Sequence, residues 1–68
     1  MFFAKIGGWT EVYAFADTAE KAKKLAVAKK KSFARDDLEK WTWETVADYY
    51  GATCIEIKPD MVFSDNEI

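Results

Sequence analysis

Residues 11–33, EVYAFADTAEKAKKLAVAKKKSF, decide the fold because they join a strand-like run to a helix-like run. Small and aromatic side chains alternate along residues 11–16, which is the period of a β-strand. The alternation places Val12, Ala14 and Ala16 on one face and Glu11, Tyr13 and Phe15 on the other. The sequence therefore predicts a sheet with one small face and one aromatic face.

Asp17 and Glu20 mark the start of the following helix. Their spacing is that of a capping box, so we expect the helix to begin near Thr18. At helical spacing the apolar stripe consists of Ala22, Leu25, Ala26, Lys29 and Phe33, with the Lys29 stem extending toward solvent. The small members of this stripe would let the helix lie close to the small face of the sheet.

The segments on either side complete a β-hairpin and add a second helix. Residues 2–6 form a short apolar run that ends at a glycine pair, which is typical of a strand followed by a hairpin loop. Downstream, Thr42 or Thr45 can cap a helix that ends at Tyr50, and Gly51 suits its C-terminus. The spacing predicts that this helix packs inward through Trp43, Val46 or Ala47, and Tyr50.

Residues 53–58 alternate as a third strand, which Pro59 ends. We expect Ile55 and Ile57 on one face, and Cys54, Glu56 and Lys58 on the opposite, outer face. The fold predicted is α+β: a three-stranded antiparallel sheet in a ββααβ chain, strand order 2-1-3, with the helices packed on one face. Residues 1–68 form one small domain in this interpretation, and residues 60–68 form a C-terminal tail of which the end is loosely held.

Composition excludes several classes of protein. The chain has 68 residues, one cysteine and no histidine, so it can form neither an internal disulfide framework nor an ordinary structural zinc site. No apolar run approaches the roughly 20 residues of a membrane span. We expect a cytoplasmic protein that carries no cofactor or metal and does not bind membranes.

Charge is divided along the chain. Residues 21–35 hold seven basic residues and no acid, whereas residues 36–68 hold nine acids and two basic residues. A basic helix surface can bind phosphates through counterion release, and it can also bind an acidic protein surface. Most such surfaces are simply solvated. The candidates for nucleic-acid binding are Lys21, Lys23, Lys24, Lys31 and Arg35.

Aromatic residues supply the main functional clue. The aromatic sheet face has no helix to cover it, so the tail, a second copy or a partner protein must do so. Stacking of unpaired bases is a weaker alternative there, since the glycine-flanked aromatic signatures of RNA-binding sheets are missing. The candidates for protein interaction are Phe3, Trp9, Tyr13, Phe15, Trp41 and Tyr49. Of the three tryptophans, we expect Trp41 to be the most exposed.

Enzymatic interpretations are weaker. A chain without histidine has no Ser-His-Asp or Cys-His arrangement. Asp17, Glu56 and Lys58, with Asp60 nearby, could in principle hold Mg²⁺ as in a metal-dependent nuclease, although charged outer strand faces are common. We therefore expect no catalytic residue. The preferred hypothesis is a small interaction module, as a homodimer or docked on a larger protein; the alternative is a nucleic-acid-binding protein. The size suits a bacterial or phage accessory protein or inhibitor, but no residue pattern supports that context.

Overall fold

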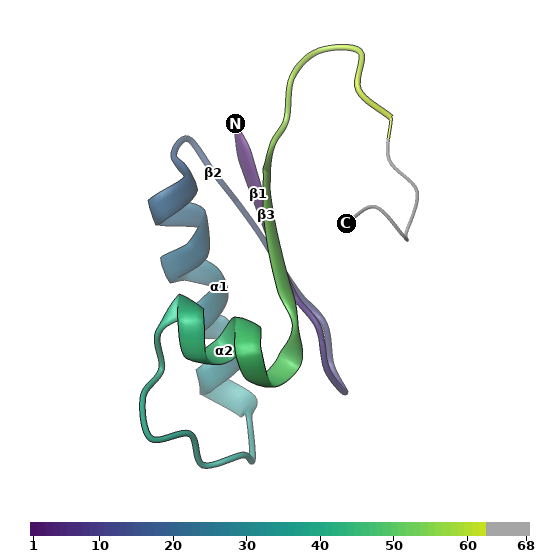
Figure 1. The fold of residues 1–68 in the computed structure, drawn as a ribbon. Helices are drawn as coiled ribbons and strands as arrows, with labels where there is room; N and C mark the ends of the chain where they lie inside the picture. The colour runs from purple at the N-terminus through teal and green to yellow at the C-terminus, as the bar shows by residue number, and fades with distance from the viewer. Residues whose placement is uncertain (63–68) are drawn as a thin grey trace.

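A computed structural model describes residues 1–62 of the chain. Three strands and two helices follow in the order β1 (Phe2–Ile6), β2 (Val12–Ala16), α1 (Ala19–Phe33), α2 (Trp43–Tyr50) and β3 (Ala52–Glu56) (Figure 1). The strands form one antiparallel sheet in the order β2-β1-β3. The α+β class, the ββααβ order and the sheet order are therefore confirmed. For residues 63–68 the prediction of a loosely held tail lies outside the described part of the chain.

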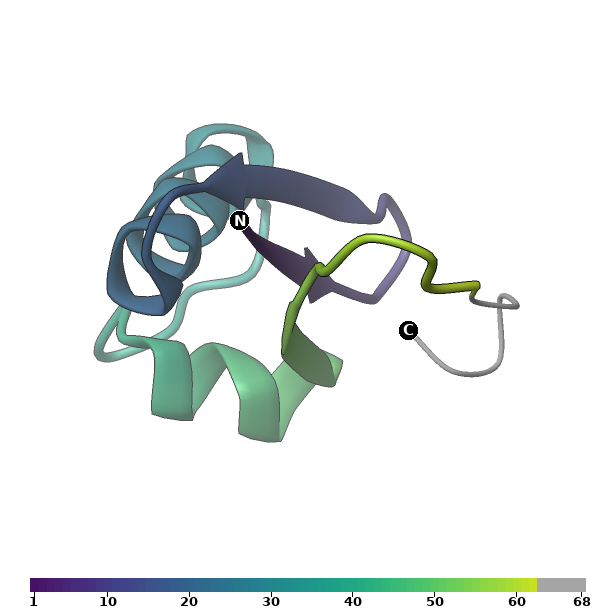
Figure 2. The same cartoon turned by 90° about the horizontal axis from the view of Figure 1, so that it is seen from above.

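Both helices lie on the same side of the sheet (Figures 1 and 2). α1 packs about equally on β1 and β2, while α2 contacts β3 and β1. No helix within residues 1–62 is long and apolar enough to cross a membrane.

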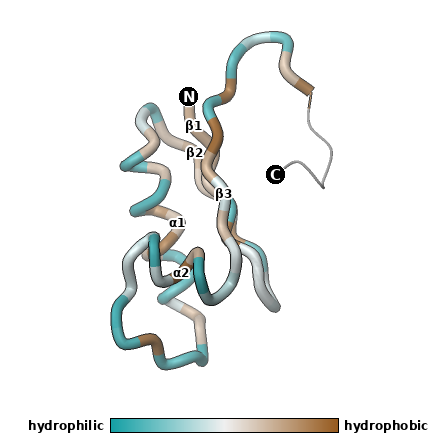
Figure 3. The backbone as a smooth tube through the Cα atoms, in the orientation of Figure 1, coloured by the Kyte–Doolittle hydropathy of each residue, from teal (hydrophilic) through white to brown (hydrophobic). Residues whose placement is uncertain are grey.

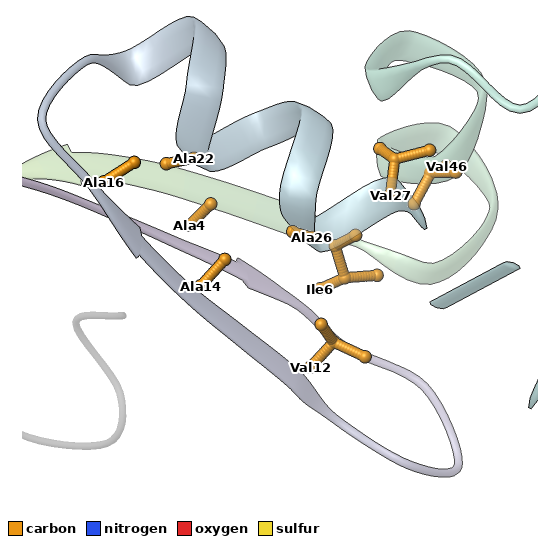
Figure 4. Packing of buried hydrophobic residues seen from close by; sticks show 9 residues of the cluster. All are labelled: Ala4, Ile6, Val12, Ala14, Ala16, Ala22, Ala26, Val27 and Val46. Carbon is orange, nitrogen blue, oxygen red and sulfur yellow. The ribbon is translucent and has the colours of Figure 1, made fainter. Parts of the chain in front are cut away.

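The inner face of the sheet is built from small side chains. Ala4 lies opposite Ala14 on one side and Cys54 on the other, and paired residues of an antiparallel sheet share a face. Figure 4 shows Ala22 and Ala26 of α1 above this surface. Alanines on both sides let the helix approach closely. The core is consequently thin, and its largest fully buried side chains are those of Ile6 and Val46.

The buried stripe of α1 differs from the one predicted. The residues that point inward are Ala22, Ala26, Val27 and Lys30. Leu25 and Phe33 are exposed, so the prediction that they pack inward was wrong; Lys29, expected to extend from this stripe toward solvent, is exposed as well. Because the facing sheet surface is so close, the larger apolar side chains fit only on the flank of the helix. Hydrophilic and hydrophobic stretches alternate along α1 (Figure 3), as in a helix with one side on the sheet and the other in solvent.

The faces of β3 are also reversed from the prediction. Cys54 pairs with Ala4 on the inner face and is half-buried against the core. Ile55 pairs with Phe3 on the outer face. The reason is again steric: Cys54 lies beside Ala4, where the alanines of α1 pack on the sheet and a small residue fits, so the larger isoleucine lies on the aromatic side.

The helix ends follow ordinary capping chemistry. Thr18, and not Asp17, caps α1 by accepting a hydrogen bond from the backbone N–H of Lys21. Thr42 caps α2, where its reciprocal bonds with Thr45 form a capping box. Gly51 ends α2 at a φ of 87°, a conformation that favours glycine, as the sequence predicted.

Candidate interaction surface

The outer face of the sheet has three aromatic rings at its centre. Phe3 of β1 lies directly opposite Phe15 of β2, and its ring centroid is 4.9 Å from that of Phe15 and 5.8 Å from that of Tyr13. Ile55 of β3 flanks Phe3 on the other side. Strand alternation therefore gathers predicted interaction residues from two strands into one cluster, which we call the aromatic face (Phe3, Tyr13, Phe15 and Ile55).

Exposure is unequal within the aromatic face. Phe3 is only 6% exposed because its neighbours surround it, whereas Tyr13 and Phe15 are 54% and 56% exposed. Each of these two rings thus has one side packed on Phe3 and another turned to solvent. Since both belong to the edge strand β2, the exposed apolar area lies along one border of the sheet.

Polar groups border the aromatic face at the hairpin end of the sheet. The Tyr13 hydroxyl donates a hydrogen bond of 2.7 Å to Glu11 Oε1, and Lys5 Nζ lies 3.4 Å from Glu11 Oε2. The hydrogen bond from Tyr13, and then the nearby Lys5, lower the pKa of the Glu11 carboxyl below its usual value. At neutral pH the Glu11 carboxylate is therefore ionised, and its negative charge is balanced by the nearby Lys5.

Trp9 extends from the tip of the β1–β2 hairpin and is fully exposed. The loop beneath it is held by Lys30 of α1, which is only 2% exposed. The Lys30 ammonium donates hydrogen bonds to the carbonyl oxygens of Gly7 (2.9 Å) and Thr10 (2.7 Å), and it lies 4.3 Å from the ring centroid of Tyr50. No local pattern distinguishes Lys30 from its neighbours, because it lies between two other lysines.

A groove of about 510 Å³ opens between the hairpin tip and the end of α1. Its walls include Trp9, Phe33, Tyr50, Arg35 and Asp36. Asp36 accepts hydrogen bonds from the hydroxyls of Tyr49 (3.1 Å) and Tyr50 (2.8 Å). Desolvation, followed by the bond to Asp36, raises the pKa of Tyr50 to about 12, so the phenol keeps its proton above pH 10.

The two remaining aromatic candidates lie away from the aromatic face. Tyr49 is exposed on α2. Trp41 is half-buried and packs against the core beside Tyr50, so the prediction that it is the most exposed tryptophan was wrong. Trp41 instead lines, with Trp43 and Val27, a groove of about 750 Å³ between α1 and the start of α2.

The structure separates the five basic candidates into two groups. Lys21 pairs with Asp17 and Lys24 with Glu20, each at 3.6 Å, and the ammonium of Lys23 lies 5.5 Å from the Trp43 ring. Lys31 and Arg35 are exposed, and neither forms an ion pair within residues 1–62. Of the five candidates, Lys31 and Arg35 at the C-terminal end of the predicted phosphate-binding surface are therefore the ones best placed to bind a phosphate.

The residues considered for a nuclease are not brought together. Ala16 of β2 and Glu56 of β3 pair with Phe2 from opposite sides, so β1 lies between their strands and separates them by roughly 10 Å. Asp17 follows Ala16 directly, and it is therefore far from Glu56. The Glu56 carboxylate forms an ion pair with Lys58, with 3.7 Å between Oε1 and Nζ. Within residues 1–62 no three Cys, Asp or Glu side chains gather into a group that could hold a metal ion.

Comparison of this chain with protein families, with curated proteins and with solved structures finds no match. The fold and the exposed surfaces therefore define it only as a small α+β domain with an aromatic sheet face.

Proposed function

We propose that the protein is a non-catalytic interaction module that self-associates through its sheet. The observation that carries the proposal is the exposure of Tyr13 and Phe15 beside a buried Phe3. Half-exposed aromatic rings packed on a third ring form a pre-ordered apolar surface. Little side-chain entropy is lost when such a surface is covered, and aromatic residues dominate the energetics of many interfaces.

Sedimentation velocity over a wide range of protein concentration tests this proposal. The wild-type chain should show a concentration-dependent dimer. Phe15→Lys places a charge in the apolar area and should weaken association by about 2 kcal/mol, or roughly 30-fold in Kd. Tyr49→Lys is the matched control, because Tyr49 is equally exposed but lies on α2. A wild-type chain that stays monomeric at every concentration would refute self-association.

Nucleic-acid binding is the second candidate, favoured by the proximity of Arg35 to the exposed Trp9 across their shared groove. Single-stranded nucleic acids bind where cationic side chains accompany an aromatic ring that can stack on a base. The double variant Lys31→Glu with Arg35→Glu should then abolish salt-dependent binding of a labelled single strand. Lys21→Glu is the control, because Lys21 is already paired with Asp17. Equal loss in both variants would indicate only a general charge effect.

A further inference from the structure

We infer that the second copy binds along the β2 edge, so that two sheets join into one continuous six-stranded antiparallel sheet. This inference rests on the self-association proposed above and specifies its geometry. β2 is an edge strand, since the order of the sheet is β2-β1-β3. Its sequence, VYAFA, has none of the proline, internal charge or bulge with which proteins commonly block edge pairing.

The side chains of β2 match themselves when two copies pair antiparallel about Ala14. In that register Tyr13 of each copy lies opposite Phe15 of the other, giving two cross-strand aromatic pairs on the outer face. On the inner face Ala14 meets its own counterpart, and Val12 meets Ala16. Aromatic residues thus pair with aromatic residues and small residues with small ones, and the aromatic faces of the two copies form one continuous surface.

The charges at the ends of β2 do not oppose this pairing. Glu11 of one copy would lie near Asp17 of the other, which would be unfavourable for two isolated carboxylates. Each is already paired within its own chain, however: Glu11 with Lys5 at 3.4 Å and Asp17 with Lys21 at 3.6 Å.

The exposed flank of α1 lies on the same side as the β2 edge. α2 adjoins the opposite flank, where Lys23 and Val27 line the groove between the helices. The flank away from α2 therefore faces past β2, and it carries the apolar Leu25, which is 50% exposed. Leu25 is a large side chain that the close packing of α1 on the sheet leaves outside the core.

The spacing of the helices fits such a dimer. α1 packs about equally on β1 and β2 and to a lesser extent on β3, so its axis lies at least about 2.4 Å inside β2 for strands about 4.8 Å apart. A two-fold axis about 2.4 Å beyond β2 then places the helix axes at least about 10 Å apart, close to the upper end of the distances at which helices pack. Figure 4 shows Ala26 over the inner face between Ala14 and Ile6, so the neighbouring Leu25 would lie close to the two-fold axis and approach Leu25 of the second copy.

The area available indicates a weak, reversible dimer. Half of a buried aromatic residue amounts to about 100 Å², so the rings of Tyr13 and Phe15, one leucine and the strand edge offer roughly 400 Å² per chain. About 800 Å² in total is below the roughly 1,200 Å² at which standard specific interfaces begin. Association should therefore require high protein concentration.

Disulfide trapping tests the register directly. In a Cys54→Ser background, one chain carries Tyr13→Cys and a second carries Phe15→Cys. In the proposed register, position 13 of one copy lies directly opposite position 15 of the other, with Cα atoms about 4.5–5.5 Å apart, which is within disulfide range. Position 13 of both copies, or position 15 of both, lies on a diagonal of about 7–8 Å, which is too far. The mixed pair also keeps one Phe15–Tyr13 contact intact. Mass spectrometry of the oxidised mixture should show mainly the mixed disulfide, with few of either symmetric dimer.

The two proposals fail in distinguishable ways. If sedimentation shows a dimer but the disulfides form in statistical proportions or not at all, the edge geometry is wrong and self-association stands. A monomer at every concentration refutes both. A second arm uses folded surface variants: Leu25→Lys should weaken the dimer at least tenfold, while Ala28→Lys, on the exposed surface of the same helix, should leave it unchanged. Equal association of the two variants would also overturn the edge geometry.

Discussion

Lys30 donates a hydrogen bond of 2.9 Å from its ammonium to the carbonyl oxygen of Gly7, 23 residues earlier in the chain. A second bond, to Thr10, reaches the other side of the hairpin loop. Lysine is almost never fully buried unless its charge is compensated, and here two carbonyls and the ring of Tyr50 compensate it. The helix thereby fixes the loop that presents Trp9.

Replacing Lys30 by methionine should destabilise the protein by about 1–3 kcal/mol, because the two loop carbonyls would stay covered while losing their donor. Methionine keeps most of the buried aliphatic stem, so the loss of stability measures the contribution of the ammonium group. Lys31→Met is the control: Lys31 is exposed, and its replacement should change the free energy of unfolding by less than about 0.5 kcal/mol. Urea unfolding of both variants measures the difference, and equal midpoints would mean that the two hydrogen bonds contribute nothing.

Gly8 should be more sensitive to alanine substitution than Gly51. Both have positive φ, 105° and 87°, so each alanine variant carries backbone strain of about 1–3 kcal/mol. At Gly8 the added Cβ would also lie 2.9 Å from the Tyr50 ring and 3.0 Å from Lys30 Nζ, whereas at Gly51 it meets nothing within 4 Å. The melting temperature of Gly8→Ala should therefore be lower than that of Gly51→Ala. The reverse order would show that the loop shifts easily.

The sequence predicted those elements for which local pattern and packing agree. Val12, Ala14 and Ala16 alternate cleanly with larger residues, and the structure buries all three. Gly51 and Thr42 mark helix ends through local chemistry that requires no knowledge of the rest of the fold.

Prediction failed where tertiary packing chose between equivalent local patterns. Lys29, Lys30 and Lys31 are identical in type, and only the position of the helix over Gly7 decides which is buried. Cys54 and Ile55 could each face inward in a regular strand; the close approach of α1 excludes the larger one. These two errors have one cause, the alanine-rich contact between helix and sheet.

That contact should tolerate little added volume. Ala26 is fully buried in the cluster between α1 and the sheet, so Ala26→Leu adds methylene groups where none fit. Overpacking of this kind costs about 1–3 kcal/mol. Ala28→Leu makes the same change on the exposed side of the helix and should be nearly neutral. Urea unfolding measures both, and a neutral Ala26→Leu would mean that the helix can move away from the sheet at little cost.

Stability should fall at alkaline pH through Tyr50. Its pKa is raised from 10.0 to about 12 in the folded chain, so above pH 10 the unfolded chain loses this proton while the folded chain keeps it. The stabilisation due to Tyr50 is therefore complete below pH 10 and is lost as the pH rises toward 12.

Tyr50→Phe removes the ionisable hydroxyl and its bond to Asp36 while keeping the ring over Lys30. Wild type should be the more stable protein at neutral pH, and its advantage should shrink between pH 10 and 12. Urea midpoints of both proteins across that range measure the change, and tyrosinate absorbance should show one fewer late-titrating group in the variant. An advantage that stays constant with pH would mean that Tyr50 ionises equally easily in the folded and unfolded chains, and that the Asp36 hydrogen bond does not hold its proton.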